Sequence, residues 1–273
     1  MPFASLSFHK TDTIRLLQFP EEIYLNLQHA ILASWPLGIE SDGPFGTTDG
    51  SYQFKLKGKP FGWLMNRESV GGARLVRDIL AFIYYSNWET VMPLAYAERL
   101  SSKDLLIFRP RPPEAAPLLQ MEWLALAPAK SDRLYVIGDS QPVFQAPRGM
   151  LAETNHVAWV TISLTQLLRE SGVLQSAETK YNWVEYKLKG RPWSRGGEGG
   201  VKTRALLLRI LHVLDQCGWT AHTTIQHRTG NDDRRMLDTI FFRRPKGLPS
   251  TTPPRSPPIQ PLASDLPPYT RPN

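Results

Sequence analysis

The sequence predicts an α+β protein made of two tandem repeats, each a mainly antiparallel sheet with helices on one face, followed by a disordered C-terminal tail. Two segments, Tyr52–Phe61 and Trp183–Trp193, share the pattern Lys-Leu-Lys-Gly-x-Pro followed by an aromatic residue. Each segment leads into a stretch with helical periodicity that ends near a tryptophan, Trp88 in the first copy and Trp219 in the second. A long internal repeat of this kind is the sequence signature of a duplicated structural unit.

A third pair of segments closes each copy, Asp104–Arg109 and Asp238–Arg243. Equivalent positions in the three pairs are separated by about 130 to 134 residues, which indicates duplication of one whole module. We therefore place the first repeat at residues 1–117, the second at 118–245 and a proline-rich tail at 246–273. The boundary between the repeats falls in a cluster of prolines, which continue neither a helix nor a strand ladder: Pro110, Pro112, Pro113 and Pro117.

Within each repeat the spacing of apolar residues predicts two helices. The first is expected at Glu21–Ser34, behind Pro20, and at His156–Ser171 in the second copy, where Gly172 supplies the stop. The second helix carries a broad apolar stripe over Leu75–Ile83 and again over Leu206–Leu214.

Alternation of apolar and polar residues predicts the strands, and a hairpin is expected where two of them flank residues 128–132. The expected strands are Asp12–Leu16, Tyr52–Leu56, Thr90–Ala97 and Asp104–Arg109, then Glu122–Ala127, Arg133–Ile137, Trp183–Leu188, Thr220–Gln226 and Asp238–Arg243. The two sheets could join edge to edge or stay separate, and the sequence favours neither.

Composition points to an intracellular, soluble protein. The 273-residue chain has 41% hydrophobic residues and a single cysteine, Cys217, so no intrachain disulfide is possible. No apolar run approaches the roughly 20 residues of a membrane span, and the first ten residues do not resemble a secretion signal. We expect a cytoplasmic or nuclear location.

The net charge is +7, which favours anionic partners, although no run of five or more cations occurs. The segment between the strand and the second helix of the second repeat is rich in glycine and cations and could present backbone N–H groups to a phosphate or carboxylate. The residues of this anion-binding hypothesis are Arg191, Arg195, Gly196, Gly197, Lys202 and Arg204. A flexible connector explains the same composition, and a Walker A loop is excluded because Val201 stands where that motif needs glycine.

Other chemistry finds less support. Gly138-Asp139-Ser140 resembles a lipase nucleophile motif, but no downstream Asp-x-x-His supplies a base, so an ordinary turn is the better interpretation. The six histidines show no metal-ligand spacing. The pair Glu68 and Arg74 recurs as Glu198 and Arg204, which favours a structural role at a helix start. We predict no cofactor, no metal and no catalytic residue.

The tail is different in kind, since nine of its 28 residues are proline. Arg255, Pro258 and Pro261 fit the Arg-x-x-Pro-x-x-Pro pattern of SH3 ligands, which form a polyproline II helix. Leu266, Pro267 and Tyr269 fit a Leu-Pro-x-Tyr ligand of WW domains. Proline-rich segments also match such patterns by accident, so a passive tail is the alternative.

The repeated Lys-Gly-x-Pro-aromatic segments and the closing Asp-x-x-x-Phe segments resemble an uncharacterised family of fungal proteins with tandem Lys-Gly-x-Pro-Trp repeats. The resemblance covers most of residues 12–243 and implies a fold but no activity. The first copy departs from the family pattern, with Phe61 in place of the tryptophan and Asn87 in place of the glycine.

The sequence supports three hypotheses of function. The first is a non-catalytic interaction or scaffold protein whose tail docks SH3- or WW-domain partners. The second is a module that binds a phosphorylated ligand, nucleic acid or a lipid head group through the loop of the second repeat. An enzyme is the third, and the lack of an acid–base or nucleophile constellation makes it the weakest.

Overall fold

The computed structural model describes residues 3–62, 67–94, 102–138, 156–180, 183–194, 197–225 and 238–247. Within these ranges the chain forms two six-stranded antiparallel sheets and four α-helices. The predicted α+β fold with two repeat-like halves is confirmed.

Each half uses the same order of elements, strand–strand–helix–strand–strand–helix–strand–strand. The first half consists of β1 (Ala4–His9), β2 (Thr13–Leu17), α1 (Glu21–Ser34), β3 (Ile39–Pro44), β4 (Ser51–Leu56), α2 (Arg67–Tyr85), β5 (Trp88–Leu94) and β6 (Ser102–Pro110). The second half consists of β7 (Met121–Ala129), β8 (Arg133–Ile137), α3 (His156–Glu170), β9 (Leu174–Lys180), β10 (Trp183–Leu188), a 3-10 turn (Pro192–Ser194), α4 (Gly197–Gln216), β11 (Thr220–Ile225) and β12 (Thr239–Pro245).

The strand order is also repeated. Sheet 1 has the order β3-β4-β2-β1-β6-β5, and sheet 2, read from its equivalent edge, has the order β9-β10-β8-β7-β12-β11. The registers correspond as well, since Leu6 pairs with Leu106 in sheet 1 and Leu126 with Ile240 in sheet 2. The duplication seen in the sequence is therefore a duplication of topology and register.

The expected helices and paired strands are present with small differences at their ends, and the β7–β8 hairpin is confirmed. Three strands escaped the sequence patterns: β1, β3 and β9. Two of them, β3 and β9, are edge strands, and their sequences Ile-Glu-Ser-Asp-Gly-Pro and Leu-Gln-Ser-Ala-Glu-Thr-Lys show no apolar face. An edge strand gains its stability from backbone pairing on one side, so its side chains carry little pattern.

The helices end in the same way in both halves. Asn87 and Gly218 precede the equivalent strands β5 and β11, and both have left-handed backbone angles, with φ of 65° and 81°. Glycine takes this conformation without strain and asparagine tolerates it. The replacement of glycine by Asn87 in the first copy therefore preserves the local fold.

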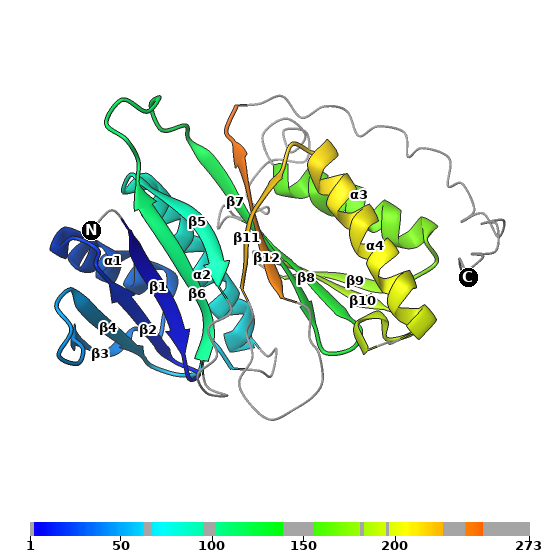
Figure 1. Cartoon of the computed structure of the whole chain (residues 1–273). Helices are drawn as coiled ribbons and strands as arrows, with labels where there is room; N and C mark the ends of the chain where they lie inside the picture. Colours follow the sequence, from blue (N-terminus) through cyan, green and yellow to red (C-terminus); the bar gives the residue numbers. More distant parts are fainter. Residues whose placement is uncertain are drawn as a thin grey trace, which may run out of the picture.

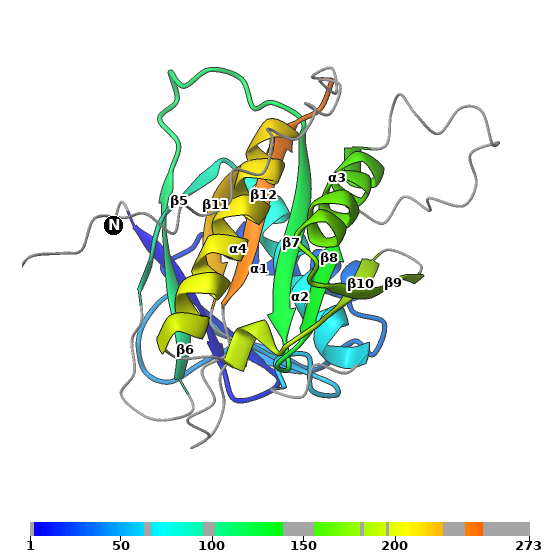
Figure 2. The ribbon, with the colours of Figure 1, turned by 90° about the vertical axis from the view of Figure 1, so that its right-hand side faces the viewer.

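The two sheets do not join edge to edge; they stack in layers with α2 between them (Figures 1 and 2). Helices α1 and α2 cover one face of sheet 1, and α3 and α4 cover one face of sheet 2. We call the opposite face of each sheet its outer face. The outer face of sheet 2 packs on α2, so one hydrophobic cluster contains residues of both halves.

The burial of strand β7 reflects this arrangement. Seven consecutive residues, Trp123–Ala129, are buried, whereas buried and half-buried residues alternate along β1. A strand covered on both faces has near-continuous apolar character, and a strand covered on one face alternates. The continuous buried run Trp123–Ala129 therefore reflects a strand that is covered on both faces.

Candidate functional site

The anion-binding hypothesis rests on the segment that joins β10 to α4. Arg191 is exposed there with a left-handed backbone, φ 51°, and α4 starts at Gly197, where φ is 57°. Arg195 and Gly196 lie outside the described residues. Lys202 and Arg204 both lie on the first turns of α4 and are exposed. Arg191 therefore lies in the connection itself, and Gly197, Lys202 and Arg204 lie in the first turns of the helix that follows it.

This connection is held on both sides by hydrogen bonds. The indole N–H of Trp193 donates to the carbonyl oxygen of Arg133 at 2.5 Å, and the Thr203 hydroxyl donates to the carbonyl oxygen of Pro192. In the first repeat the helix approaches the equivalent proline carbonyl with a glycine in place of the threonine. A β-carbon built on Gly72 would lie 1.8 Å from the carbonyl oxygen of Pro60, so only glycine fits there. The connection is a fixed part of the repeat in both copies.

The charges around the connection are only partly compensated. Lys202 Nζ lies 3.1 Å from Glu198 Oε1, with side chains 70% and 85% exposed, and such solvated pairs contribute little. Arg191 and Arg204 form no ion pair with another described residue. Two exposed guanidinium groups attract anions, one just before the start of α4 and one about two turns into the helix.

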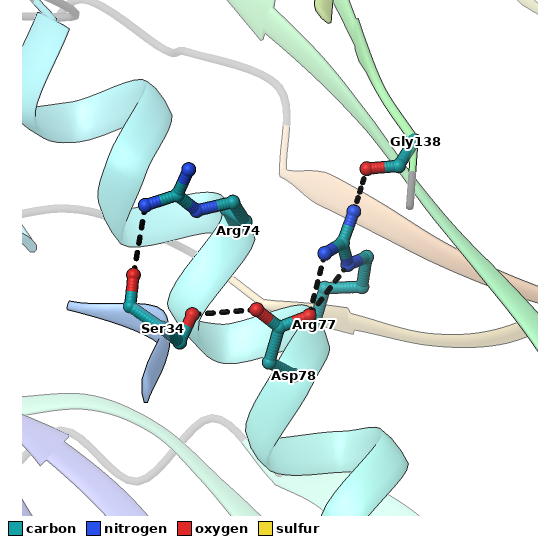
Figure 3. Close-up of polar contacts among 5 residues, drawn as sticks. All are labelled: Ser34, Arg74, Arg77, Asp78 and Gly138. Atoms are coloured by element: carbon teal, nitrogen blue, oxygen red, sulfur yellow. Dashed lines mark hydrogen bonds and ion pairs between the residues drawn. The ribbon is translucent and has the colours of Figure 1, made fainter. Parts of the chain in front are cut away.

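Arg74 and Arg204, which the sequence paired by their spacing from Glu68 and Glu198, lie in different surroundings. A guanidinium N–H of Arg74 donates to the carbonyl oxygen of Ser34 at 2.8 Å, and burial lowers the pKa of Arg74 (Figure 3). Arg204 is exposed. Helix α2 aligns with α4 by a shift of 131 residues, because Leu75, Ile79 and Ile83 match the buried Leu206, Ile210 and Leu214. Arg74 is therefore the structural equivalent of Ala205.

A polar network that the sequence did not predict lies at the junction of the two repeats (Figure 3). Arg77 is 1% exposed and donates to the carbonyl oxygen of Gly138, at the end of β8. Its guanidinium also pairs with Asp78 at 2.6 Å, and Asp78 in turn accepts from the Ser34 hydroxyl at 2.5 Å. A buried arginine is tolerated because its donors meet a carboxylate and a carbonyl. The only sequence signal was a charge within the apolar stripe of α2.

Aromatic residues form a second part of the junction. The rings of Tyr84 and Trp123 lie 5.9 Å apart, edge to face, and Arg243 lies 5.4 Å from the centre of the Tyr84 ring. Trp123 also packs edge to face on His222, whose Nε2 lies 3.0 Å from the Thr90 hydroxyl oxygen. Burial, with Arg243 nearby, lowers the pKa of His222 from 6.5 to about 3, so the ring is neutral at ordinary pH. This cluster packs the repeats together and leaves His222 without a titration near neutrality.

Tyr85 anchors the start of β7. Its hydroxyl accepts from the Met121 backbone N–H at 2.7 Å and donates to the Met121 carbonyl oxygen at 3.1 Å. The tyrosine thereby replaces a strand neighbour at that position. Tyr84 and Tyr85 thus hold the two repeats together.

The other predicted sites fall outside the described residues. They include the SH3-type and WW-type residues of the tail, Arg255, Pro258, Pro261, Leu266, Pro267 and Tyr269, and the Asp139-Ser140 turn. In the described ranges no group of three or more His, Cys, Asp or Glu side chains could hold a metal ion. The same part of the chain has no helix with the length and apolar character to cross a membrane.

The fold and its junction define a class of protein: a tandem duplication of one α+β domain whose copies pack helix layer against sheet. One family model of a single domain matches the chain twice, over residues 2–109 and 122–243. The chain therefore belongs to this uncharacterised domain family and contains two copies of the domain. No curated protein and no solved structure matches.

Proposed function

We propose that this protein is a non-catalytic interaction or scaffold protein of the cytoplasm or nucleus, whose proline-rich tail docks partner domains. The observation that carries the proposal is where the domain ends. The second family match stops at residue 243 and β12 at Pro245, whereas both docking motifs lie beyond residue 250. Both motifs therefore lie outside the two copies of the domain.

The chemistry of the tail suits this role. Prolines restrict the unbound chain to extended conformations, so less entropy is lost when it docks in an aromatic groove. Arg255, with Pro258 and Pro261, would meet an SH3 groove that carries acidic residues at one end. Leu266, Pro267 and Tyr269 would meet a WW domain.

The experiment compares the full chain with a chain that ends at residue 247, each immobilised and exposed to panels of purified SH3 and WW domains. The full chain is expected to retain domains that the shorter chain does not. Pro258→Ala with Pro261→Ala is expected to remove SH3 capture only, and Leu266→Ala with Tyr269→Ala to remove WW capture only. Each pair of substitutions is the matched control for the other.

The same two chains test the independence of tail and body. Removal of 248–273 is expected to leave the midpoint of chemical unfolding nearly unchanged, because the described core lies before residue 248. A large loss of stability contradicts the independence of tail and body, and equal capture by both chains contradicts the docking role.

A second candidate function is the binding of an anionic ligand at the connection between β10 and α4. It is favoured by Arg191 and Arg204, exposed guanidinium groups that form no ion pair with another described residue. The test measures binding of inorganic phosphate, a single-stranded oligonucleotide and vesicles with anionic lipid at rising salt. Arg191→Gln with Arg204→Gln is expected to weaken binding several-fold and to lower its salt dependence, while the exposed Arg169→Gln on α3 has no effect. Binding that is unchanged by Arg191→Gln with Arg204→Gln would exclude this site.

A further inference from the structure

The junction between the repeats joins two unlike surfaces, the helix α2 of one repeat and the outer sheet face of the other. Each repeat carries both kinds of surface, because the fold is duplicated. One of each remains without a counterpart within the described residues: the outer face of sheet 1 and the outward side of α4 (Figure 1). We compare these two surfaces with their equivalents at the junction.

The outer face of sheet 1 keeps the pattern of a helix-receiving surface at its centre. At the junction the central strand β7 presents small residues, Ala125 and Ala127, which let α2 approach closely. The register places Ser5 and Ser7 of β1 at the same positions, since Ser5 pairs with Ile107 as Ala125 pairs with Phe241. Both serines are small and have no bulky side chain to hold a helix away.

Exposed apolar residues share the outer face with this small-residue strand, on β5 and on the neighbouring β2, where Arg15 opposite Ser7 is the exception. Met92 and Leu94 on β5 pair with Ile107 and Leu105 on β6, and they point to the outer face. They are 46% and 42% exposed, and Leu17 on the other side is 36% exposed. Neighbouring apolar side chains exposed on one sheet face are typical of an interaction surface.

The outward side of α4 has a matching apolar row. By the shift of 131 residues, Val201 and Leu208 occupy the places of Val70 and Arg77, which α2 buries at the junction. Val201 is 52% exposed and Leu208 67% exposed. Helix α4 therefore exposes apolar side chains at two positions that its copy α2 buries, one with a valine and one with the arginine of the junction network.

The charges at one end of the two surfaces are complementary. At the junction Tyr84 lies beside Arg243, and the equivalent residues are Asp215 on α4 and Arg109 on β6. Arg109 and Arg111 share the single carboxylate of Glu89, which leaves one positive charge in excess. Asp215, which forms no ion pair with another described residue, would supply the missing negative charge.

We propose that this protein associates head to tail, with the outward side of α4 of one copy docked on the outer face of sheet 1 of a second copy. The contact repeats between two chains the packing that joins the two halves within one chain. It is heterologous, since the two surfaces differ, so each added copy offers a fresh surface and the assembly grows or closes into a ring.

The experiment measures mass by sedimentation and light scattering of the full chain over a range of concentrations. The wild-type chain is expected to form species larger than a monomer as concentration rises. Leu208→Glu, which blocks the α4 surface, and Met92→Glu, which blocks the sheet surface, are each expected to be monomeric. Both side chains are exposed, so each variant is expected to keep the unfolding midpoint of the wild type.

Mixing the two variants is the decisive step. Each retains the one surface that the other has lost, so an equal mixture is expected to form a one-to-one dimer and nothing larger. Head-to-tail contact alone predicts this recovery. A symmetric contact, or association through the tail, leaves the mixture no different from the separate variants and overturns the proposal, as does a wild-type chain that stays monomeric at its highest soluble concentration.

A charge exchange tests the predicted register of the contact. Asp215→Arg is expected to weaken the association severalfold, and Asp215→Arg mixed with Arg109→Asp is expected to recover it. Glu198→Arg, an acid-to-arginine change in the first turn of the same helix, serves as the control and is expected to weaken association less. Equal effects of the two arginine substitutions would contradict the placement of Asp215 beside Arg109.

Discussion

Helices α2 and α4 are copies of one element, but they lie in different surroundings. Helix α2 has sheet 1 on one side and sheet 2 on the other, and its buried residues include an arginine and a tyrosine. Helix α4 has a sheet on one side only, and three of its residues are buried: Leu206, Ile210 and Leu214. The shared residues are those that pack within the repeat, and the residues that differ are those at the junction.

The central strands repeat this comparison. Strand β7 has alanines where α2 covers it, and β1 has serines where no described element covers it. The two sheets therefore have the same fold but differ in what lies on their outer faces. A duplicated domain keeps its own core because each copy must fold, and it changes its outer surface according to what lies next to it.

The largest expected effect tests the shared core. Trp219 is 2% exposed in the second repeat, and its equivalent Trp88 is 8% exposed in the first. We expect Trp219→Ala to lower the free energy of unfolding by about 3–5 kcal/mol and Trp88→Ala by a similar amount, because each empties a large volume in its own core. Denaturant unfolding measures both. A change below about 1 kcal/mol at Trp219 would mean that the ring is not part of the core.

A smaller and sharper effect separates the two central strands. Ala125→Leu is expected to destabilise the protein by about 1–3 kcal/mol, because the added atoms meet α2 at a fully buried position. Ser5→Leu, the equivalent change in sheet 1, is expected to stay within about 0.5 kcal/mol, since its side of the strand is only half-buried. Both are measured at low protein concentration. Equal costs at the two positions would show that the faces are not different.

The smallest effect concerns pH and the junction. The unfolded chain binds a proton at His222 near its ordinary pKa of 6.5, whereas the folded chain binds one only near a pKa of about 3. The stability linked to this ring is therefore complete above pH 6.5 and is lost as the pH falls toward 3.

We expect the free energy of unfolding to fall by about 1 kcal/mol between about pH 7 and pH 5, with allowance for the exposed part of the His222 ring. His222→Gln is expected to remove this part of the acid sensitivity. His9→Gln is the matching measurement on the other sheet, because burial, with Arg15 nearby, also lowers the pKa of His9, from 6.5 to about 4. If the two glutamine variants lose stability with pH as the wild type does, neither ring is the group that titrates.

Much of the fold could be predicted from local patterns. The helical spacing in Glu21–Ser34 and the alternation in Trp183–Leu188 gave elements with those same bounds. The edge strands β3 and β9 could not be predicted, because pairing on one side leaves no apolar face to detect. The anion-binding hypothesis stays a prediction: Arg191 precedes α4, and Lys202 and Arg204 lie within its first turns. The sequence also paired Arg74 with Arg204, although their surroundings differ.

The sequence by itself determined that one module was copied and that each copy folds as a sheet with helices on one face. It could do so because hydrophobic periodicity and turn residues act over short stretches of chain, and a repeat shows them twice. Only the tertiary structure decided that α2 lies between the two sheets, that Arg77 reaches Gly138, and that β1 and α4 keep one side uncovered by any other described element. Those contacts join residues far apart in the chain, where shape and burial rather than local pattern determine which surfaces meet.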